Sequence, residues 1–169
     1  VLNRTDRDFF FLRRRDPETV VQTIAQLCQT RLPKNMGIPA TEIQVLSPTR
    51  KGETGTKNLN LALQAVLNPP AAGKKEKRYG DFSFREGDRV MQIRNNYDIL
   101  WKNPNGLGAG TGIFNGDIGV IVQIDYETEL VTVDFDDKRA EYAFDLLGEL
   151  EPAYAMTIHK SQGSEYRAV

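Results

Sequence analysis

Cysteine, histidine and long apolar runs are what this sequence has least of. It holds one cysteine, Cys28, and one histidine, His159, among 169 residues. An internal disulfide is therefore excluded, and a zinc site built from cysteine and histidine is not expected. No apolar run approaches the roughly 20 residues of a membrane span, and no signal peptide pattern is visible. The sequence predicts a cytoplasmic protein with no membrane contact and no metal site of its own.

The sequence also lacks an excess of positive or negative charge. Lysine and arginine number 22 against 23 aspartate and glutamate, for a net charge of −1. Such a balance gives no overall attraction to nucleic acid, so any binding must come from local patches. Hydrophobic content of 40% and charged content of 27% are ordinary for a globular chain that forms one large domain or two small ones.

The phosphate-binding pattern Gly-x4-Gly-Lys-Ser/Thr is absent as well. No strand ending in paired acids accompanies it, so a Walker B motif is not visible either. We therefore expect this chain, taken alone, not to hydrolyse ATP.

The first part of the chain alternates predicted strands and helices. Residues 8–12 predict a short buried strand, and residues 16–32 predict a helix that begins with an Asp cap and a proline. Residues 33–41 predict a loop and residues 43–46 a second strand. A second amphipathic helix ends at Asn68. This order is typical of a parallel α/β layer.

The middle of the chain follows a different pattern. Residues 71–80 predict a mobile linker, and the glycine-rich residues 103–112 predict a long flexible hairpin loop. Short strands separated by turns indicate a small antiparallel barrel, SH3-like or OB-like. The predicted strands are residues 90–93, 118–124, 130–135 and 139–144. A strand at residues 153–158 then returns to the α/β pattern, which predicts that the barrel is an insertion.

Two polar loops follow predicted strands of the α/β part, at residues 48–56 and 157–165. Ligands bind at the carboxyl ends of strands in open α/β sheets. The first loop opens a helix, whose free N–H groups together with Arg50 and Lys51 would favour an anion. A plain turn and cap is the alternative for this loop, and an ordinary solvated loop is the alternative for the second.

Both loops resemble motifs of RecD-like superfamily 1B DNA helicases. Residues 153–166 (AYAMTIHKSQGSEY) resemble motif V, and residues 45–56 (VLSPTRKGETGT), with the Leu-Asn and Leu-Gln pairs that follow, resemble motif IV. Residues 87–92 (GDRVMQ) and 114–119 (FNGDIG) are similar to the SH3-like insert that these helicases carry between the two motifs. The resemblance covers nearly the whole chain.

The resemblance implies a fold class and a domain layout. The expected fold is α/β, a partial RecA-like parallel sheet with helices plus an inserted small antiparallel SH3-like β-barrel. Residues 1–80 and 146–169 would form the discontinuous RecA-like domain 2A, and residues 81–145 the inserted 2B barrel. Motif VI is expected after Val169, so the chain is interpreted as a fragment.

The resemblance also implies a function. The whole protein would be an ATP-dependent helicase that moves 5′ to 3′ on single-stranded DNA, related to the alpha subunit of exodeoxyribonuclease V. ATP and Mg²⁺ would lie between this domain and a missing N-terminal RecA-like domain 1A of the same chain. The fragment would hold neither ligand by itself. Nuclease or helicase partner subunits are a further expectation.

Individual residues take roles from the matched motifs. Arg50 matches the motif IV arginine, a γ-phosphate sensor or arginine finger, because a fixed guanidinium suits charge spread over phosphate oxygens. Its alternative is a solvated surface arginine. Gly163 and Glu165 match positions that face the nucleotide.

Other residues are expected to contact DNA. Positions of motif V that meet the DNA backbone are matched by Thr157, His159, Lys160 and Ser161. For His159 the alternative is a structural histidine; neither a general base nor a metal ligand is implied. In the barrel, Tyr97 and Trp101 would stack on bases, or else cover the barrel core.

Two other classes of function stay open. One is an SH3-like module that binds a peptide or partner protein, with the α/β part as scaffold. The other is the helicase part of a conjugative relaxase of the TraA type, which shares these motifs. Walker motifs upstream would favour a helicase, and an upstream histidine cluster would favour the relaxase.

Overall fold

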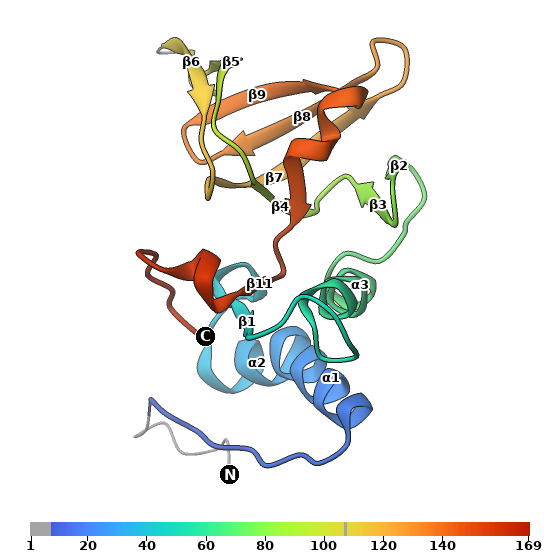
Figure 1. Ribbon diagram of the computed structural model, residues 1–169, viewed down its shortest axis with the longest axis vertical. Coiled ribbons are helices and arrows are strands. Elements are labelled where there is room, and N and C mark those ends of the chain that lie inside the picture. Colours follow the sequence, from blue (N-terminus) through green and yellow to red (C-terminus); the bar gives the residue numbers. More distant parts are fainter. Residues whose placement is uncertain (1–7, 107) are drawn as a thin grey trace. The chain divides into compact units, whose positions relative to one another are not determined.

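The structure, a computed structural model, describes residues 8–106 and 108–169. The chain divides into two compact units, which we call the helical unit (Val1–Pro69 with Tyr154–Val169) and the sheet unit (Pro70–Ala153). The domain boundaries expected after residues 80 and 145 both fall inside the sheet unit. Figure 1 shows the elements of each unit.

The helical unit begins with α1 (Pro17–Gln26), which continues through a π-helical turn at Leu27–Arg31 into α2 (Leu32–Met36). The Asp16 carboxylate caps α1 by accepting the backbone N–H of Thr19 at 2.8 Å, and this bond lowers the pKa of Asp16. The loop expected at residues 33–41 is wrong in its first part, because α2 extends to Met36. Pro33 stands in the first turn of α2, directly after the π-helical turn.

The parallel sheet of the helical unit is small. It pairs β1 (Val45–Ser47) with β11 (Ala155–Thr157), and a single parallel bridge joins Ile43 to Ala168. The remaining elements are the 3₁₀ turns Ala40–Glu42 and Ile158–Ser161 and the helix α3 (Thr56–Leu67). The two strands confirm the parallel pairing that the sequence predicts, but the sheet is far less extensive than expected.

The buried strand predicted at residues 8–12 is wrong. The chain there forms no strand, and the side chains of Phe9 and Phe11 are each 78% exposed. A strand needs a free sheet edge to satisfy its backbone. In the described chain, β11 pairs with β1 on one side, and on its other side the Asn60 side chain bonds both backbone groups of Ala155. Ala168 pairs with Ile43, just before β1.

The core of the helical unit lies where the helices meet this small sheet. Its buried members are Cys28, Ile38, Ile43, Leu59, Leu63, Tyr154 and Ala155. Burial raises the pKa of the Cys28 thiol to about 11, because the charged thiolate is poorly solvated there.

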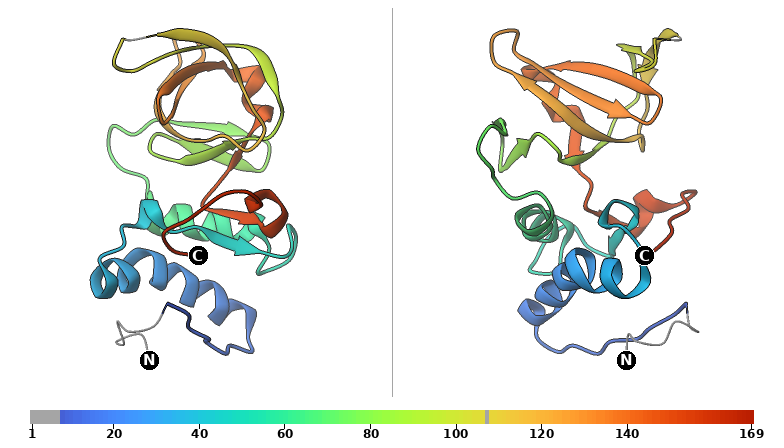
Figure 2. Two further views of the ribbon diagram at one scale, coloured as in Figure 1. Left: turned by 90° about the vertical axis from the view of Figure 1, so that its left-hand side faces the viewer. Right: turned by 180° about the vertical axis from the view of Figure 1, so that it is seen from behind.

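The sheet unit contains a hairpin and a seven-stranded antiparallel sheet that curls on itself (Figure 2). The hairpin joins β2 (Glu76–Tyr79) to β3 (Phe82–Arg85). Strands of the sheet lie in the order β10-β4-β7-β8-β9-β5-β6. Their bounds are β4 Arg89–Gln92, β5 Asn96–Lys102, β6 Ala109–Ile113, β7 Ile118–Asp125, β8 Leu130–Phe135, β9 Lys138–Ala143 and β10 Leu150–Pro152, with a 3₁₀ turn at Phe144–Glu149.

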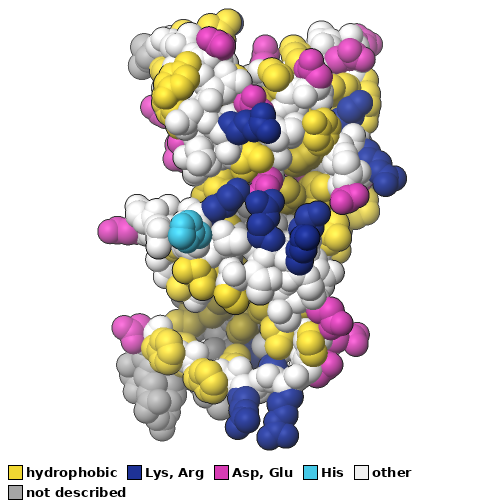
Figure 3. All heavy atoms as spheres, in the orientation of Figure 1, with side chains coloured by type: hydrophobic (Ala, Val, Ile, Leu, Met, Phe, Trp, Pro, Cys, Tyr) yellow, Lys and Arg dark blue, Asp and Glu magenta, His cyan; other side chains and the backbone are white. Residues whose placement is uncertain are grey.

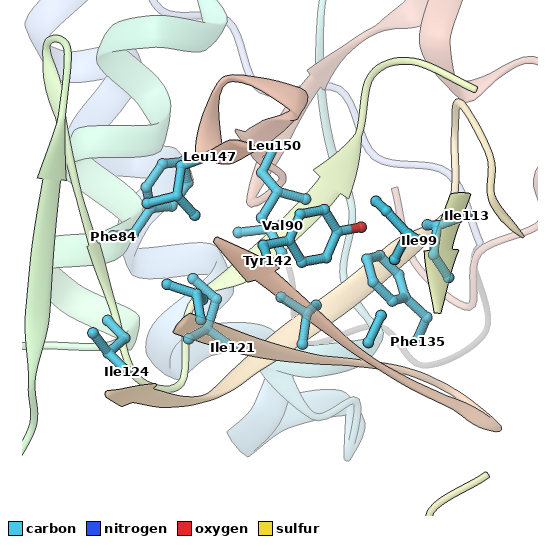
Figure 4. Packing of buried hydrophobic residues seen from close by; sticks show 13 residues of the cluster. Phe84, Val90, Ile99, Ile113, Ile121, Ile124, Phe135, Tyr142, Leu147 and Leu150 are labelled. Atoms are coloured by element: carbon cyan, nitrogen blue, oxygen red, sulfur yellow. The ribbon is translucent and has the colours of Figure 1, made fainter. Parts of the chain in front are cut away.

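Alternating apolar residues build the core of the sheet unit (Figure 4). On β8, Val131, Val133 and Phe135 point inward, as the period of two requires. Gly119 on β7 permits the close approach of β8, since a Cβ there would lie 2.6 Å from the carbonyl oxygen of Asp134. The buried hydroxyl of Tyr142 donates to Gln92 Oε1 at 3.0 Å.

Four strands of the sheet unit confirm predictions, namely β4, β7, β8 and β9. The mobile linker predicted at residues 71–80 is wrong at Glu76–Tyr79, which forms β2. The flexible loop predicted at residues 103–112 is wrong at its end, because β6 begins at Ala109 and pairs with β5. Gly110 of β6 lies opposite Trp101, where a Cβ would meet the indole ring at 2.6 Å.

Candidate functional site at the end of the parallel strands

The two polar loops leave the same edge of the parallel sheet. Ser47 ends β1 and Thr157 ends β11, and these two residues are paired in the register of the strands. The segments 48–55 and 158–165 therefore begin side by side within the helical unit (Figure 1). The structure thus brings the Arg50 loop and the His159 loop together, while their contacts with ligands stay predictions.

Internal hydrogen bonds fix the shape of the Arg50 loop. The Ser47 hydroxyl, on a side chain that is buried, donates to the carbonyl of Thr54 at 2.8 Å and accepts the N–H of Thr49 at 3.3 Å. The Thr49 hydroxyl donates to the carbonyl of Lys51 at 2.6 Å. One buried hydroxyl thus ties both ends of the loop together, which holds the backbone that carries Arg50.

Three N–H groups at the start of α3 are not free, contrary to the prediction. The N–H groups of Gly55, Thr56 and Lys57 donate to the carbonyls of Gly52, Thr49 and Arg50, at 3.1, 3.0 and 3.3 Å. The loop folds back tightly at this point, since a Cβ on Gly55 would lie 2.4 Å from the Lys51 carbonyl oxygen. These three N–H groups leave phosphate binding to other groups, among them the side chains of the loop.

Arg50 is the side chain that suits this task. It is exposed and stands on a loop whose backbone is bonded at both ends. A guanidinium of this kind fits a nucleotide phosphate. For Mg²⁺ the fit is poor: in the described part of the chain, no three His, Cys, Asp or Glu side chains gather in a group that could hold a metal ion. A guanidinium donates hydrogen bonds and carries positive charge, so the loop suits an anion and not a cation.

The His159 loop opens with a 3₁₀ turn at Ile158–Ser161. His159 is exposed (cyan in Figure 3), and Glu165 is exposed further along the loop. The Ser161 hydroxyl donates to the carbonyl of Ile158 at 2.8 Å, so its proton is already engaged. Gly163 adopts φ 86°, a left-handed turn that glycine favours, with open space around its α-carbon.

Tyr97 and Trp101 belong to β5 of the sheet unit. Tyr97 is 66% exposed and makes an edge-to-face contact with Phe114, their ring centroids 5.5 Å apart. Trp101 is half-buried and packs against the core of the sheet unit, and Lys138 Nζ lies 5.5 Å from its ring centroid. The geometry of Trp101 agrees with the core-covering alternative, whereas Tyr97 keeps a ring available for stacking.

Asn60 of the helical unit belongs to the Leu-Asn pair quoted with motif IV, but the sequence reasoning gave it no role. Its side chain is 6% exposed and bonds both backbone groups of Ala155 in β11. The signal was a polar residue on the apolar face of α3, between Leu59 and Leu63. A helix buries a carboxamide there only when the amide has partners.

Comparison with known proteins shows the family to which part of the chain is similar. Residues 59–135 match the family described as "ATP-dependent RecD-like DNA helicase SH3 domain". This chain carries a RecD-like helicase SH3 domain. The resemblance of the sequence to RecD-like helicases is thereby confirmed. Most of the matched residues lie in the sheet unit.

Two curated relatives extend the likeness beyond that domain. The ATP-dependent RecD2 DNA helicase of Deinococcus radiodurans is 36% identical over 136 residues, covering 80% of the RecD-like chain and 16% of the relative. The uncharacterized protein MJ1519 of Methanocaldococcus jannaschii is 30% identical over 166 residues, covering 90% of the chain and 14% of the relative. The chain thus spans about a sixth of the first relative's length and about a seventh of the second's.

Among solved structures, Bacteroides Pif1 bound to single-stranded DNA aligns over 90% of the RecD-like chain and 42% of its own chain. The identity is 15% and the TM-score 0.36, values that do not establish a shared fold. Over its described residues, the chain has no helix with the length and apolarity that crossing a membrane requires.

Proposed function

We propose that this chain works as part of an ATP-dependent DNA helicase, in which the paired loops of the helical unit contact both ATP and single-stranded DNA. The register of Ser47 with Thr157 is the observation that carries the proposal, because it starts the Arg50 loop and the His159 loop at one sheet edge. Similarity to a RecD2 helicase supports it. The helical unit would be the RecA-like part, and the sheet unit its SH3-like insertion.

The proposed roles follow the chemistry of each side chain. Arg50 would stabilise negative charge on the phosphate that is transferred to water. Gly163 would let the backbone approach the nucleotide, and Glu165 would accept a ribose hydroxyl or order a water near the cation. When bound, ATP supplies energy through its hydrolysis. The phosphate-binding loop with its lysine and the main Mg²⁺ ligands would come from another RecA-like domain.

DNA would lie along the first half of the second loop. Its contacts would come from Thr157, His159, Lys160 and Ser161, with Ser161 first giving up its bond to Ile158. In the sheet unit, Tyr97 would offer a ring on which a base can stack. Trp101 would chiefly pack on the core of that unit. Movement from 5′ to 3′ belongs to the same proposal.

Replacing Arg50 tests the nucleotide role. In the full-length helicase that the proposal requires, Arg50→Ala should lower DNA-stimulated ATP turnover by at least about 100-fold, since it removes a cation from the developing charge. Arg50→Lys should recover only a small part of that loss, because an ammonium cannot form the two parallel hydrogen bonds that a guanidinium donates to two phosphate oxygens. Turnover is measured by phosphate release at saturating single-stranded DNA.

Arg13→Ala is the matched control, because Arg13 is an exposed arginine on the irregular segment before α1. It should leave turnover within about twofold of the parent, as surface substitutions usually do. Equal rates for Arg50→Ala and Arg13→Ala would remove Arg50 from the nucleotide site.

A further inference from the structure

We infer that Asn60 is a positioning residue that couples the Arg50 loop, proposed to bind the nucleotide and called the nucleotide loop below, to the His159 loop, proposed to bind DNA and called the DNA loop below. The inference rests on the proposed function and adds to it a side chain that touches neither ligand. Asn60 lies in α3, which begins directly after the Arg50 loop, and its carboxamide reaches β11, which leads into the His159 loop.

The bridge from Asn60 to Ala155 uses both halves of the carboxamide. Asn60 Nδ2 donates to the Ala155 carbonyl at 2.9 Å, and the Ala155 N–H donates to Asn60 Oδ1 at 2.8 Å. Both groups of Ala155 point away from β1, whose Val45 is instead bonded to Tyr154. The side chain therefore takes the place of a neighbouring strand along the outer edge of β11.

Burial makes this bridge hard to replace. Asn60 is 6% exposed and Ala155 is 1% exposed, so water cannot readily substitute for either bond. Leaving both backbone groups of Ala155 unpaired would be costly, which favours α3 and β11 moving as one piece. Ala155 is only two residues from Thr157, where the DNA loop begins.

The same helix is fastened to the nucleotide loop. The N–H groups of Thr56 and Lys57, in the first turn of α3, donate to the carbonyls of Thr49 and Arg50. Asn58 Nδ2 donates to the carbonyl of Glu53 at 2.6 Å. A displacement of Arg50 on binding or losing a phosphate is thus passed through α3 and Asn60 to β11, and DNA acts on Arg50 by the reverse route.

Asn60→Asp tests the coupling with a change of one group. Above the pKa of the new carboxyl, the side chain still accepts from Ala155 N–H but repels the Ala155 carbonyl; below it, a protonated carboxyl can donate again. Asn35→Asp is the matched control, because Asn35 is exposed on α2 and the charge change is the same. Should Asn60→Asp fail to fold, Asn60→Gln keeps the amide and displaces it by one methylene.

The first measurement uses the chain itself. Amide exchange followed by NMR should show at least about tenfold lower protection over residues 155–161 in Asn60→Asp at pH 8, with recovery toward pH 5. Strands β8 and β9 should stay unchanged, and Asn35→Asp should behave as the parent. Unchanged protection at residues 155–161 would overturn the bridge.

The second measurement uses the full-length helicase and the ratio of ATP turnover with single-stranded DNA to turnover without it. Asn60→Asp should lower this ratio at least about tenfold at pH 8, while turnover without DNA changes less than about threefold. If amide protection over residues 155–161 falls in Asn60→Asp but the turnover ratio does not change, the coupling is overturned. A parent protein whose turnover ignores DNA overturns the proposed function, and the coupling with it.

Discussion

At the scale of single residues, Cys28 reports how tightly the helical unit is packed. Its side chain is 3% exposed in the π-helical turn, and burial raises the pKa of the thiol from 9.0 to about 11. The folded state therefore holds the proton more tightly than the unfolded state does. Stability from this group is complete below the pKa of the unfolded thiol and is lost as the pH rises toward 11.

We predict that the helical unit loses about 2 kcal/mol of unfolding free energy between pH 8 and 11 through Cys28, an amount set by the two-unit pKa difference. Urea unfolding followed by circular dichroism at 222 nm measures it, since α1 and α3 lie in this unit. Cys28→Ala has no thiol and serves as the control. A Cys28→Ala variant with the same loss over this pH range would contradict the prediction.

At the scale of elements, a lysine adds to the contacts between the β2–β3 hairpin and the rest of the sheet unit. Lys77 Nζ lies 4.0 Å from the ring centroid of Phe144 and 5.9 Å from that of Tyr126. Those two rings contact each other edge to face at 5.6 Å, and the Tyr126 hydroxyl donates to the carbonyl of Glu76. A cation held against two rings is stabilised by their negative faces.

Removing this cation should loosen the hairpin alone. In Lys77→Ala, amide exchange over residues 76–85 should speed up by about 2- to 30-fold, the range that a cation–π contact of this type supports. Lys77→Arg keeps a cation on the rings and should stay within about threefold of the parent. Equal protection of the hairpin in Lys77→Ala and the parent would show that the lysine does not hold it.

At the scale of the whole molecule, the division into two units sets where the chain can be cut. The sheet unit runs from Pro70 to Ala153 and encloses its own core. The narrower range 81–145, expected from the sequence, omits β2 and β10 together with Leu147 and Leu150, which are 0% and 4% exposed. Those omissions would open the core and leave an edge of β4 without its partner.

We predict that residues 70–153 fold when expressed alone, whereas residues 81–145 do not. Trp101 is the chain's one tryptophan and packs against this core, so its fluorescence in urea follows the sheet unit. The longer piece should show one cooperative transition, and the shorter piece no transition. Cooperative unfolding of residues 81–145 with the same midpoint would show that β10 and the hairpin are dispensable.

Local pattern was sufficient for much of this protein. An apolar run between turns predicts β8, Asp16 and Pro17 predict the start of α1, and the motif likeness predicts the RecD-like family. Each of these depends on neighbours in sequence, where the period of side chains or a cap decides the outcome.

Tertiary pairing decided the rest. Residues 8–12 have the composition of a strand but pair with no described strand. The charged segment at Glu76–Tyr79 forms β2 because it pairs with Phe82–Arg85 and because Lys77 contacts an aromatic ring. The N–H groups of Thr56 and Lys57 at the start of α3 are not free because carbonyls of the Arg50 loop accept them. Asn60 and Ala155 are 95 residues apart, so only folding shows that one amide joins the two loops.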